Sequence, residues 1–286
     1  MNNYLEVKNL SKSFEDFRLH DITFTLPKGY IMGLIGPNGS GKTTTIKLIL
    51  NMLKRTSGEV KILGYDNIIG EQEAKRNLGV VFDSNYFSDE WKISQVEKSV
   101  SVFYENWNTQ KFSETLEKFH IQPSKKVKEL SKGMQMKLML ACAFSYDAKL
   151  LILDEPTSGL DPVSRDELLH ILSEYIEDGE HSVLFSTHIT GDLERAADYI
   201  TYISYGELFF SGGKDEFLDS FRIVKGGREE LSADLSKKML GIRKFTTGFE
   251  ALVKTEDLKQ FTHLNVEPAT IDDIVVFTSK RGERYE

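Results

Sequence analysis

The sequence is poor in cysteine and has no long hydrophobic run. Cys142 is its single cysteine, which excludes a disulfide framework and a cysteine-rich zinc site and is typical of a reducing compartment. The longest apolar runs, such as Leu138–Phe144, are far shorter than a membrane span, and Met1–Leu10 has no apolar stretch of signal-peptide length. We therefore expect a cytoplasmic protein, which would need another polypeptide to cross a membrane if it worked at one.

A basic excess is also missing. Lysine and arginine number 36 against 44 aspartates and glutamates, a formal net charge of -8. Domains that hold nucleic acid by bulk electrostatics usually carry a basic excess, so we expect no nucleic-acid partner. Hydrophobic residues make up 40% and charged residues 28%, which is ordinary for a globular protein. The length of 286 residues favours one large domain with a small appendage.

Strand-like and helix-like segments alternate along most of the chain. Short β-type segments between residues 4 and 26 predict a small antiparallel unit. An apolar run at 30–35, a glycine loop and a helical pattern follow, and alternation resumes from 150 to 203, which predicts a parallel sheet covered by helices. Residues 84–147 lack strand character and predict an inserted helical subdomain. We expect an α/β main domain over residues 1–224 and a small α+β accessory element over residues 225–286.

A glycine-rich loop lies between the strand predicted at 30–35 and the helix after it. It matches the phosphate-loop pattern, in which glycines let successive backbone N–H groups surround an anion and the helix adds the positive end of its dipole. We expect Lys42 to reach the β- and γ-phosphates of a nucleotide and the Thr43 hydroxyl to bind Mg²⁺. The alternative is a flexible glycine turn with a surface lysine. The loop residues are Gly36, Pro37, Asn38, Gly39, Ser40, Gly41, Lys42 and Thr43, followed by Thr44.

Two acidic residues, Asp154 and Glu155, directly follow the apolar strand predicted at Leu150–Leu153. Open α/β sheets bind ligands at the carboxyl ends of their strands. Neighbouring strand residues point in different directions, so we expect Asp154 to hold Mg²⁺ through its water shell and Glu155 to act as general base toward the attacking water. The alternative is that both acids merely end the strand at the surface.

Five motifs occur in the order and approximate spacing of an ATP-binding-cassette (ABC) ATPase, and the chain resembles a transporter's nucleotide-binding subunit over about residues 4–221. This resemblance implies a phosphate-loop NTPase fold, ATP and Mg²⁺ as ligands, and ATP hydrolysis. It also implies a head-to-tail dimer with a second cassette subunit, and a membrane-spanning permease that would hold the chain at the cytoplasmic face of the membrane. The motifs are Gly36–Thr43, Leu130–Met134, Leu150–Pro156, Ser158–Asp161 and Ser186–His188.

The resemblance places two motifs at the dimer interface. Ser131 and the Gly133 backbone would contact the γ-phosphate bound on the partner cassette, assisted by the N-terminus of the helix that starts there. Asp161 matches the loop that crosses the interface. Both Ser131 and Asp161 also suit the N-cap position of a helix, the latter because Pro162 follows it.

Two further residues take roles from the resemblance. His188 matches the switch histidine, which hydrogen-bonds the γ-phosphate and helps to fix the water; a lone histidine after a strand is otherwise more often structural. Phe14 falls where the family stacks an aromatic ring on adenine. Phe17 is a near competitor, and core packing is the alternative for either ring.

The chain departs from the family pattern at three positions. Asp83 stands where the family usually has a glutamine that touches Mg²⁺ and senses the membrane partner, and we expect its shorter carboxylate still to contact the ion when the dimer closes. Lys132 replaces a preferred glycine and is expected to point to solvent, and Met134 replaces a glutamine. None of these changes removes the base or the expected Asp154 ligand, so an active ATPase is expected.

The cargo is not encoded in any residue of the chain. The segment Glu267–Phe277 resembles the C-terminal segment of cassettes in drug, antibiotic and peptide exporters, so export is expected, with antimicrobial or amphipathic peptides as the first candidates by family analogy. The aromatic-rich stretch Asn85–Trp91 is the candidate contact for the membrane subunit, with core packing as its alternative. The rival functions are a soluble cassette ATPase in translation or DNA repair and a nucleotide-operated binding module without turnover.

Overall fold

The computed structural model describes residues 3–279 and has two sheets. Within these residues, no helix combines the length and the apolar character that crossing a bilayer requires. The strands are β1 (Asn3–Ser13), β2 (Arg18–Pro27), β3 (Ile31–Ile35), β4 (Ser57–Ile62), β5 (Tyr65–Asp66), β6 (Leu78–Val81), β7 (Leu150–Leu153), β8 (Ser182–Thr187), β9 (Tyr199–Ser204), β10 (Glu207–Gly213), β11 (Phe221–Gly227), β12 (Gly241–Lys244), β13 (Gly248–Lys254) and β14 (Asn265–Pro268). The helices are α1 (Lys42–Ile49), α2 (Glu71–Arg76), α3 (Ile93–Ser101), α4 (Thr109–Lys118), α5 (Lys132–Ser145), α6 (Pro162–Ile176), α7 (Thr190–Ala196), α8 (Lys214–Asp219), α9 (Ala233–Ser236) and α10 (Ile271–Ser279), with short 3-10 turns η1 (Val127–Glu129), η2 (Arg228–Glu230) and η3 (Thr255–Gln260).

A ten-stranded mixed sheet forms the centre of the molecule, in the order β5-β4-β1-β2-β10-β9-β3-β8-β7-β6. Strands β9, β3, β8, β7 and β6 run parallel to one another, whereas β5, β4, β1 and β2 pair antiparallel. This confirms the expected α/β fold with a parallel core and an N-terminal antiparallel unit. Because parallel strands end at the same edge, the loops after β3, β7 and β8 bring the phosphate loop, the acidic pair and His188 together.

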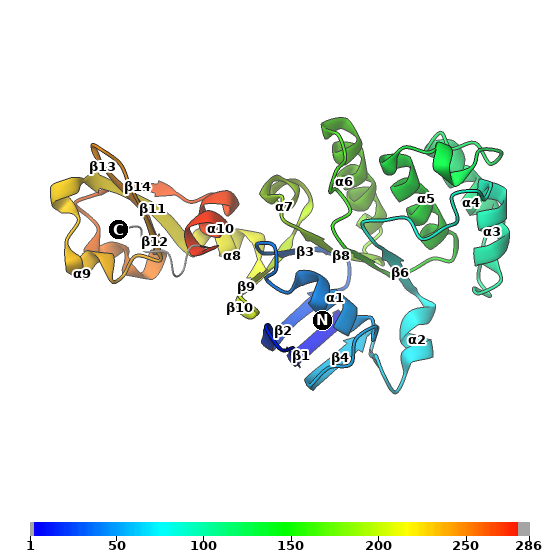
Figure 1. Cartoon of the computed structure of the whole chain (residues 1–286), viewed down its shortest axis with the longest axis horizontal. Coiled ribbons are helices and arrows are strands. Elements are labelled where there is room, and N and C mark those ends of the chain that lie inside the picture. The colour runs from blue at the N-terminus through cyan, green and yellow to red at the C-terminus, as the bar shows by residue number, and fades with distance from the viewer. Residues whose placement is uncertain (1–2, 280–286) are drawn as a thin grey trace.

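Both faces of the parallel sheet are covered, as strand β7 shows. All four residues of Leu150–Leu153 are fully buried. Leu150 and Ile152 belong to the apolar cluster shared with β1, β2 and α1, whereas Leu151 and Leu153 belong to the cluster shared with α5 and α6. Successive side chains of a strand point to opposite faces, so a strand buried on both faces must be apolar throughout. Figure 1 shows the corresponding helices on either side of the sheet.

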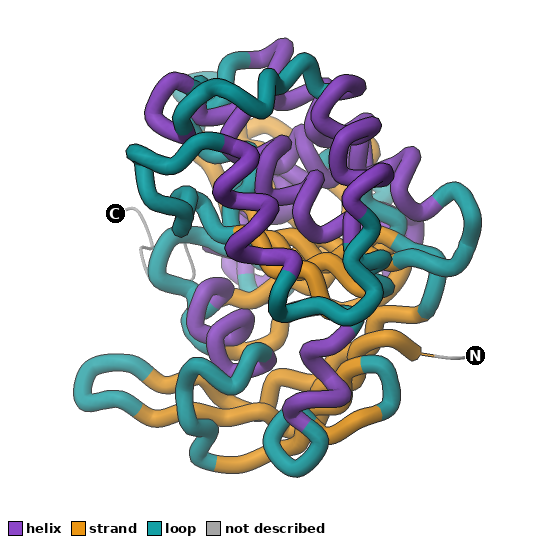
Figure 2. The backbone as a smooth tube through the Cα atoms, turned by 90° about the vertical axis from the view of Figure 1, so that its right-hand side faces the viewer, coloured by secondary structure: helices purple, strands orange, loops and turns teal. Residues whose placement is uncertain are grey.

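The chain between β6 and β7 forms the inserted helical subdomain. Helices α3, α4 and α5 follow one another there, joined by η1 and by a single isolated bridge between Lys92 and Lys126. Phe112 and Leu116 on α4 are buried four residues apart, which is the spacing of one helical face. Asn108 caps α4 by accepting from the Lys111 N–H at 2.9 Å. Figure 2 shows these helices (purple) in the upper part of the view, in front of and above the strands of the core.

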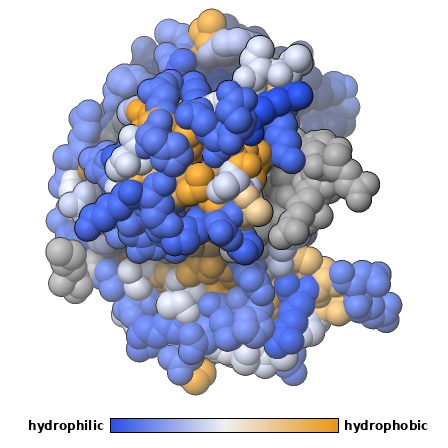
Figure 3. Space-filling view, turned by 90° about the vertical axis from the view of Figure 1, so that its left-hand side faces the viewer, coloured by the Kyte–Doolittle hydropathy of each residue, from blue (hydrophilic) through white to orange (hydrophobic). Residues whose placement is uncertain are grey.

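The accessory element contains a second, antiparallel sheet in the order β12-β13-β11-β14, with α10 packed beside it. Its first strand, β11, begins at Phe221, so the boundary expected after residue 224 falls inside a strand. Gly226 and Gly227, at the end of that strand, pair with β13. The element projects to one side of the cassette core in Figure 1, and the view onto that side is mainly hydrophilic with small apolar patches (Figure 3).

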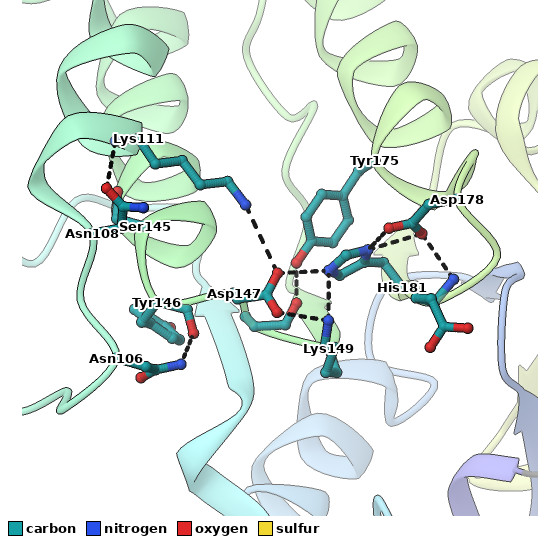
Figure 4. A network of polar contacts seen from close by, with 12 residues as sticks. Asn106, Asn108, Lys111, Ser145, Tyr146, Asp147, Lys149, Tyr175, Asp178 and His181 are labelled. Atoms are coloured by element: carbon teal, nitrogen blue, oxygen red, sulfur yellow. Dashed lines mark hydrogen bonds and ion pairs between the residues drawn. The ribbon is translucent and has the colours of Figure 1, made fainter.

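A polar network ties the helical subdomain to the edge of the sheet opposite the phosphate loop (Figure 4). His181 lies just before β8, with Nδ1 2.8 Å from Asp178 and Nε2 3.1 Å from Asp147. Lys149 approaches Asp147 at 2.6 Å, and Tyr175 donates to the Ala148 carbonyl. Partial burial raises the pKa of Asp147, but the hydrogen bonds from Lys149 and His181 outweigh it and hold the pKa below its usual value. The network holds the loop between α5 and β7 in place.

Candidate functional site

The phosphate loop depends on glycine at three positions. Gly39 and Gly41 have φ angles of 78° and 111°, in the region that favours glycine. At Gly36, a Cβ atom would lie 2.1 Å from the Ile203 carbonyl oxygen, so a side chain cannot fit between the loop and β9. The loop therefore packs closely on the sheet, Asn38 is exposed on it, and Thr44 lies in the first turn of α1.

Lys42 folds back over the loop and is only 6% exposed. Its Nζ donates to the carbonyl oxygens of Gly36 at 2.7 Å and Pro37 at 3.3 Å, and it lies 3.6 Å from Glu155 Oε1. Burial lowers the pKa of Lys42, and the nearby carboxylates of Glu155 and Asp154 oppose that shift. An anionic ligand at the loop would supply further negative charge to this buried ammonium group.

Ser40 provides a direct test of whether the loop fits a phosphate. Its hydroxyl is buried and has no hydrogen-bond partner among the residues that the structure describes. A buried polar group without a partner costs about 1–3 kcal/mol, so such groups are rare unless a ligand or water completes them. A phosphate oxygen in the loop would satisfy this hydroxyl and the charge of Lys42, so the residues present fit a bound phosphate.

Asp154, Thr43 and Ser186 form a hydrogen-bonded group beside the loop. Asp154 is 7% exposed, and its Oδ1 accepts from Ser186 at 2.6 Å and from Thr43 at 3.2 Å. This contact joins the end of β7 to the start of α1, over 111 residues of sequence. Carboxylate, hydroxyl and phosphate oxygens are the ligands that Mg²⁺ prefers. The Thr43 and Asp154 oxygens therefore suit a magnesium ion that accompanies a nucleotide.

Glu155 turns away from Asp154 because the backbone changes direction between them. Its φ of 50° is uncommon for a residue other than glycine, and its N–H donates to Ser186 Oγ at 2.9 Å. The carboxylate reaches Lys42 through Oε1 at 3.6 Å and His188 Nδ1 through Oε2 at 2.7 Å. Strained backbone is often found at functional sites. The two adjacent acids thus point in different directions, as the sequence predicted, and meet different partners.

Asp192 is a buried carboxylate that the sequence reasoning missed. Its side chain is 2% exposed, and Oδ2 accepts from Thr157 at 2.6 Å and from Thr187 at 3.2 Å. Arg165 Nε lies 3.9 Å from Oδ1. Thr157 follows the acidic pair and Thr187 precedes His188, so Asp192 joins the two loops that carry Glu155 and His188. Its position four residues after His188 was the only signal available in the sequence.

Ser131 and Asp161 both cap helices, as the alternatives from the sequence stated. Ser131 accepts from the Met134 N–H at 3.3 Å, and Asp161 accepts from the N–H groups of Val163 and Ser164 at 3.0 and 3.1 Å. Gly133 is buried and packs closely on Ser164: a Cβ atom at Gly133 would lie 3.3 Å from that side chain. The two segments therefore pack on each other at the starts of α5 and α6.

Phe14 and Phe17, the two candidates for stacking on adenine, lie at different distances from the phosphate loop. A Cβ at Gly41 would lie 3.1 Å from Phe17 Cζ, and Phe17 and Gly39 line the same surface hollow. Phe14 is 44% exposed, with its ring centroid 6.2 Å from that of Phe17. The structure thus places Phe17 rather than Phe14 against the phosphate loop.

The hinge residue Asp83 is exposed two residues after β6, at the same sheet edge as Asp154.

The fold and the loop together define a phosphate-loop nucleotide-binding protein. A protein-family model described as "ABC transporter" matches residues 19–158. The chain is 30% identical to the ABC transporter ATP-binding protein YtrB of Bacillus subtilis, over 76% of this chain and 74% of that one. It is 31% identical to the Nod factor export ATP-binding protein I of Sinorhizobium fredii, over 75% and 64%.

A solved structure, that of an ATP-binding subunit of an ABC transporter, matches with a TM-score of 0.67 and 30% identity, over 74% of this chain and 91% of that one. The chain belongs to the family of ABC transporter ATP-binding proteins. ATP is therefore the nucleotide for which the loop is built. The matched parts cover the cassette and leave about a quarter of this chain outside them.

Proposed function

We propose that this chain hydrolyses ATP, dimerises on ATP and powers export through a separate membrane-spanning subunit at the cytoplasmic face of the membrane. The observation that carries the proposal is the meeting of Lys42, Glu155 and His188, at 3.6 Å and 2.7 Å, where the parallel strands end. A cation can hold the phosphates, a carboxylate can accept a proton from the attacking water, and an imidazole beside that carboxylate can orient it, and together these groups can serve phosphoryl transfer to water.

Different residues of this site are proposed to bind the phosphates, the metal ion and the adenine of the nucleotide. Lys42 would exchange its bonds to the loop carbonyls for phosphate oxygens. Thr43 and Asp154 would hold Mg²⁺, which, when bound, neutralises charge on the phosphates. Asp83 would approach the ion from the same sheet edge when the dimer closes. Phe17 is better placed than Phe14 to stack on adenine, because its ring lies against Gly41.

Glu155 is the residue proposed to accept a proton from the attacking water. Its carboxylate is 18% exposed, so it is held in place yet open to solvent from one side. His188, which is 44% exposed, would orient this carboxylate through the 2.7 Å contact and face the γ-phosphate. Asp192 would position both residues through Thr157 and Thr187, without touching the substrate.

A second subunit is proposed to complete each ATP site. Ser131 is exposed at the start of α5, where the first N–H groups of the helix and its dipole can meet an anion. Ser131 belongs to the helical subdomain and the phosphate loop to the core sheet, on separate parts of the molecule in Figure 1. A head-to-tail dimer would bring Ser131 and Gly133 of one subunit to the nucleotide of the other. Asp161 would lie in the loop that crosses the dimer interface.

Mixing two inactive variants tests this arrangement. Lys42→Ala removes the phosphate contact and Ser131→Arg obstructs the start of α5, so each variant alone is expected to be inactive. A mixed head-to-tail dimer has one doubly defective site and one intact site. An equimolar mixture should therefore recover about one quarter of the wild-type rate if the subunits pair at random and the sites act independently. No recovery, with mixed dimers verified by differential tagging, would contradict completion of the site by a partner.

The membrane subunit is proposed to contact the surface around Tyr86 and Trp91. These rings are 56% and 37% exposed, whereas Phe87 between them is buried and belongs to the core. The relative named as an export protein supports export as the direction of transport. Antimicrobial or amphipathic peptides remain the first candidates for cargo by analogy.

Affinity purification from detergent-solubilised membranes tests this partner. A multi-span membrane protein should co-purify with the wild-type chain and be largely lost with Tyr86→Ala. Tyr65→Ala, which removes an equally large ring that is 49% exposed on β5, is the matched control and should retain the partner. Co-purification with ribosomes or DNA and no membrane protein would favour the alternative of a soluble ABC ATPase in translation or repair. Absence of phosphate release would favour a binding module.

Asp192→Ala is expected to lower the maximal ATPase rate by about 10- to 100-fold while changing ATP affinity by less than about threefold. The substitution removes the acceptor that Thr157 and Thr187 share, so the loops bearing Glu155 and His188 lose their common support. Steady-state phosphate release and nucleotide titration separate the two quantities. Asp192→Asn keeps an acceptor oxygen and should recover part of the rate. An unaltered rate in Asp192→Ala would show that this carboxylate does not position the site.

A further inference from the structure

Helix α10 of the accessory element reaches two walls of the ATP site, although it lies more than 80 residues beyond His188 in the sequence. It packs against α7 of the cassette as well as against β12 and β13 of its own sheet. Ile271 and Ile274 are fully buried, and with Phe277 they belong to the same apolar cluster as Leu193 on α7 and Tyr202 on β9. The helix is therefore a fixed part of the cassette core and of the accessory element at once.

At its N-terminal end, α10 contacts the segment that carries His188. Thr190 Oγ1 donates to Asp272 Oδ1 at 3.2 Å. Thr190 is the first residue of α7, two residues after His188 and two before Asp192. Helix α7 thus has two sets of polar contacts. Asp192 binds the loops of the site through Thr157 and Thr187, and Thr190 at the start of the helix binds Asp272 of α10.

At its C-terminal end, α10 contacts the turn that supports the phosphate loop. The buried hydroxyls of Tyr202 and Thr278 are 2.7 Å apart, and Tyr205 OH donates to the Ser279 carbonyl at 2.5 Å. Tyr205 has a φ of 51°, and the next residue, Gly206, donates its N–H to the Ser40 carbonyl of the phosphate loop at 3.1 Å. The residue that α10 contacts, Tyr205, is therefore the direct neighbour of the residue that is hydrogen-bonded to the phosphate loop.

The geometry points to Asp272 and Tyr205 as positioning residues through which the accessory element sets the activity of the ATP site. The inference rests on the proposed roles of Lys42, Glu155 and His188. Asp272 acts on the switch-histidine segment, which takes part in turnover, and the Tyr205 contact acts on the loop that binds phosphate. Any partner that shifted the accessory sheet would move α10, and with it both walls of the site.

The two contacts predict different kinetic effects. Asp272→Ala and Thr190→Val should each lower kcat by about two- to fivefold, as expected for one lost hydrogen bond, with KM for ATP unchanged. Because both remove the same contact, the double variant should be no slower than either single variant. Tyr205→Phe should raise KM by a similar factor and leave kcat unchanged. Asp234→Asn, which breaks an exposed ion pair between α9 and Lys237 just after it, is the control and should match the wild type.

Amide hydrogen exchange of the nucleotide-free protein provides a readout that does not require hydrolysis. Faster exchange is expected in residues 188–196 for Asp272→Ala and in residues 39–42 for Tyr205→Phe, each without a change in the other segment. If the wild type does not hydrolyse ATP, the proposed function fails while this measurement still decides the positioning roles. Unchanged exchange in both segments, or additive losses of rate in the Thr190 and Asp272 double variant, would overturn the inference.

Discussion

Glu155→Gln is expected to lower ATP turnover by about 10²- to 10⁴-fold, the contribution typical of a general base, while the protein still binds ATP. The amide has nearly the same size as the carboxylate but cannot accept a proton at neutral pH. Binding should persist or strengthen, because the substitution removes a negative charge 3.6 Å from Lys42, where the phosphates would lie. The variant should therefore accumulate as a stable complex with ATP rather than as nucleotide-free protein.

The measurement combines phosphate release under multiple turnover with retention of radiolabelled ATP after gel filtration. Under the head-to-tail proposal, the retained complex should elute as a dimer, because hydrolysis no longer separates the subunits. Glu177→Gln, an exposed acid at the end of α6, makes the same chemical change away from the site and should behave as the wild type. Hydrolysis at the wild-type rate in Glu155→Gln would refute its assignment as the base.

Lys42→Ala should weaken ATP binding by about 10- to 100-fold, since a hydrogen bond to a charged group contributes about 1.5–3 kcal/mol and 1.4 kcal/mol corresponds to a factor of ten. Lys42 is buried against the loop, with Nζ donating hydrogen bonds to the Gly36 and Pro37 carbonyls. Without it, the carboxylates of Asp154 and Glu155 face the phosphates with less positive charge between them. Turnover should fall as well, because the same ammonium stabilises the charge of the transition state.

Titration with a fluorescent ATP analogue measures this loss. Lys42→Arg keeps the charge, but the larger planar group does not fit the space in which Nζ meets two carbonyl oxygens, so it should bind weakly too. Lys54→Ala removes an exposed lysine just beyond α1 and is the control for a simple loss of charge. Wild-type affinity in Lys42→Ala would mean that the loop does not bind the phosphates through this residue.

The sequence predicted most of the parallel core, because its signals are local. The four buried residues of β7 are an uninterrupted apolar run, and the acidic pair follows it directly. The accessory boundary expected after residue 224 falls inside β11, because the pairing of that strand with β13 cannot be seen in the local sequence. For Phe87 the sequence left a surface contact and core packing open, since an aromatic residue in a loop has no periodic pattern that reveals its burial; the structure buries it.

The sequence alone was enough to predict the phosphate loop, since the loop depends on neighbouring residues and on the access of Gly39 and Gly41 to positive φ angles. It also predicted that Asp154 and Glu155 point in different directions, but not the positive φ of Glu155 at which the backbone turns. Tertiary structure alone decided that Phe17 lies on the loop, that Asp192 joins the segments of Glu155 and His188, and that α10 contacts both sides of the site. The physical reason is that hydrogen bonds and packing between residues as far as 82 positions apart depend on how the strands and helices are arranged, which no local pattern encodes.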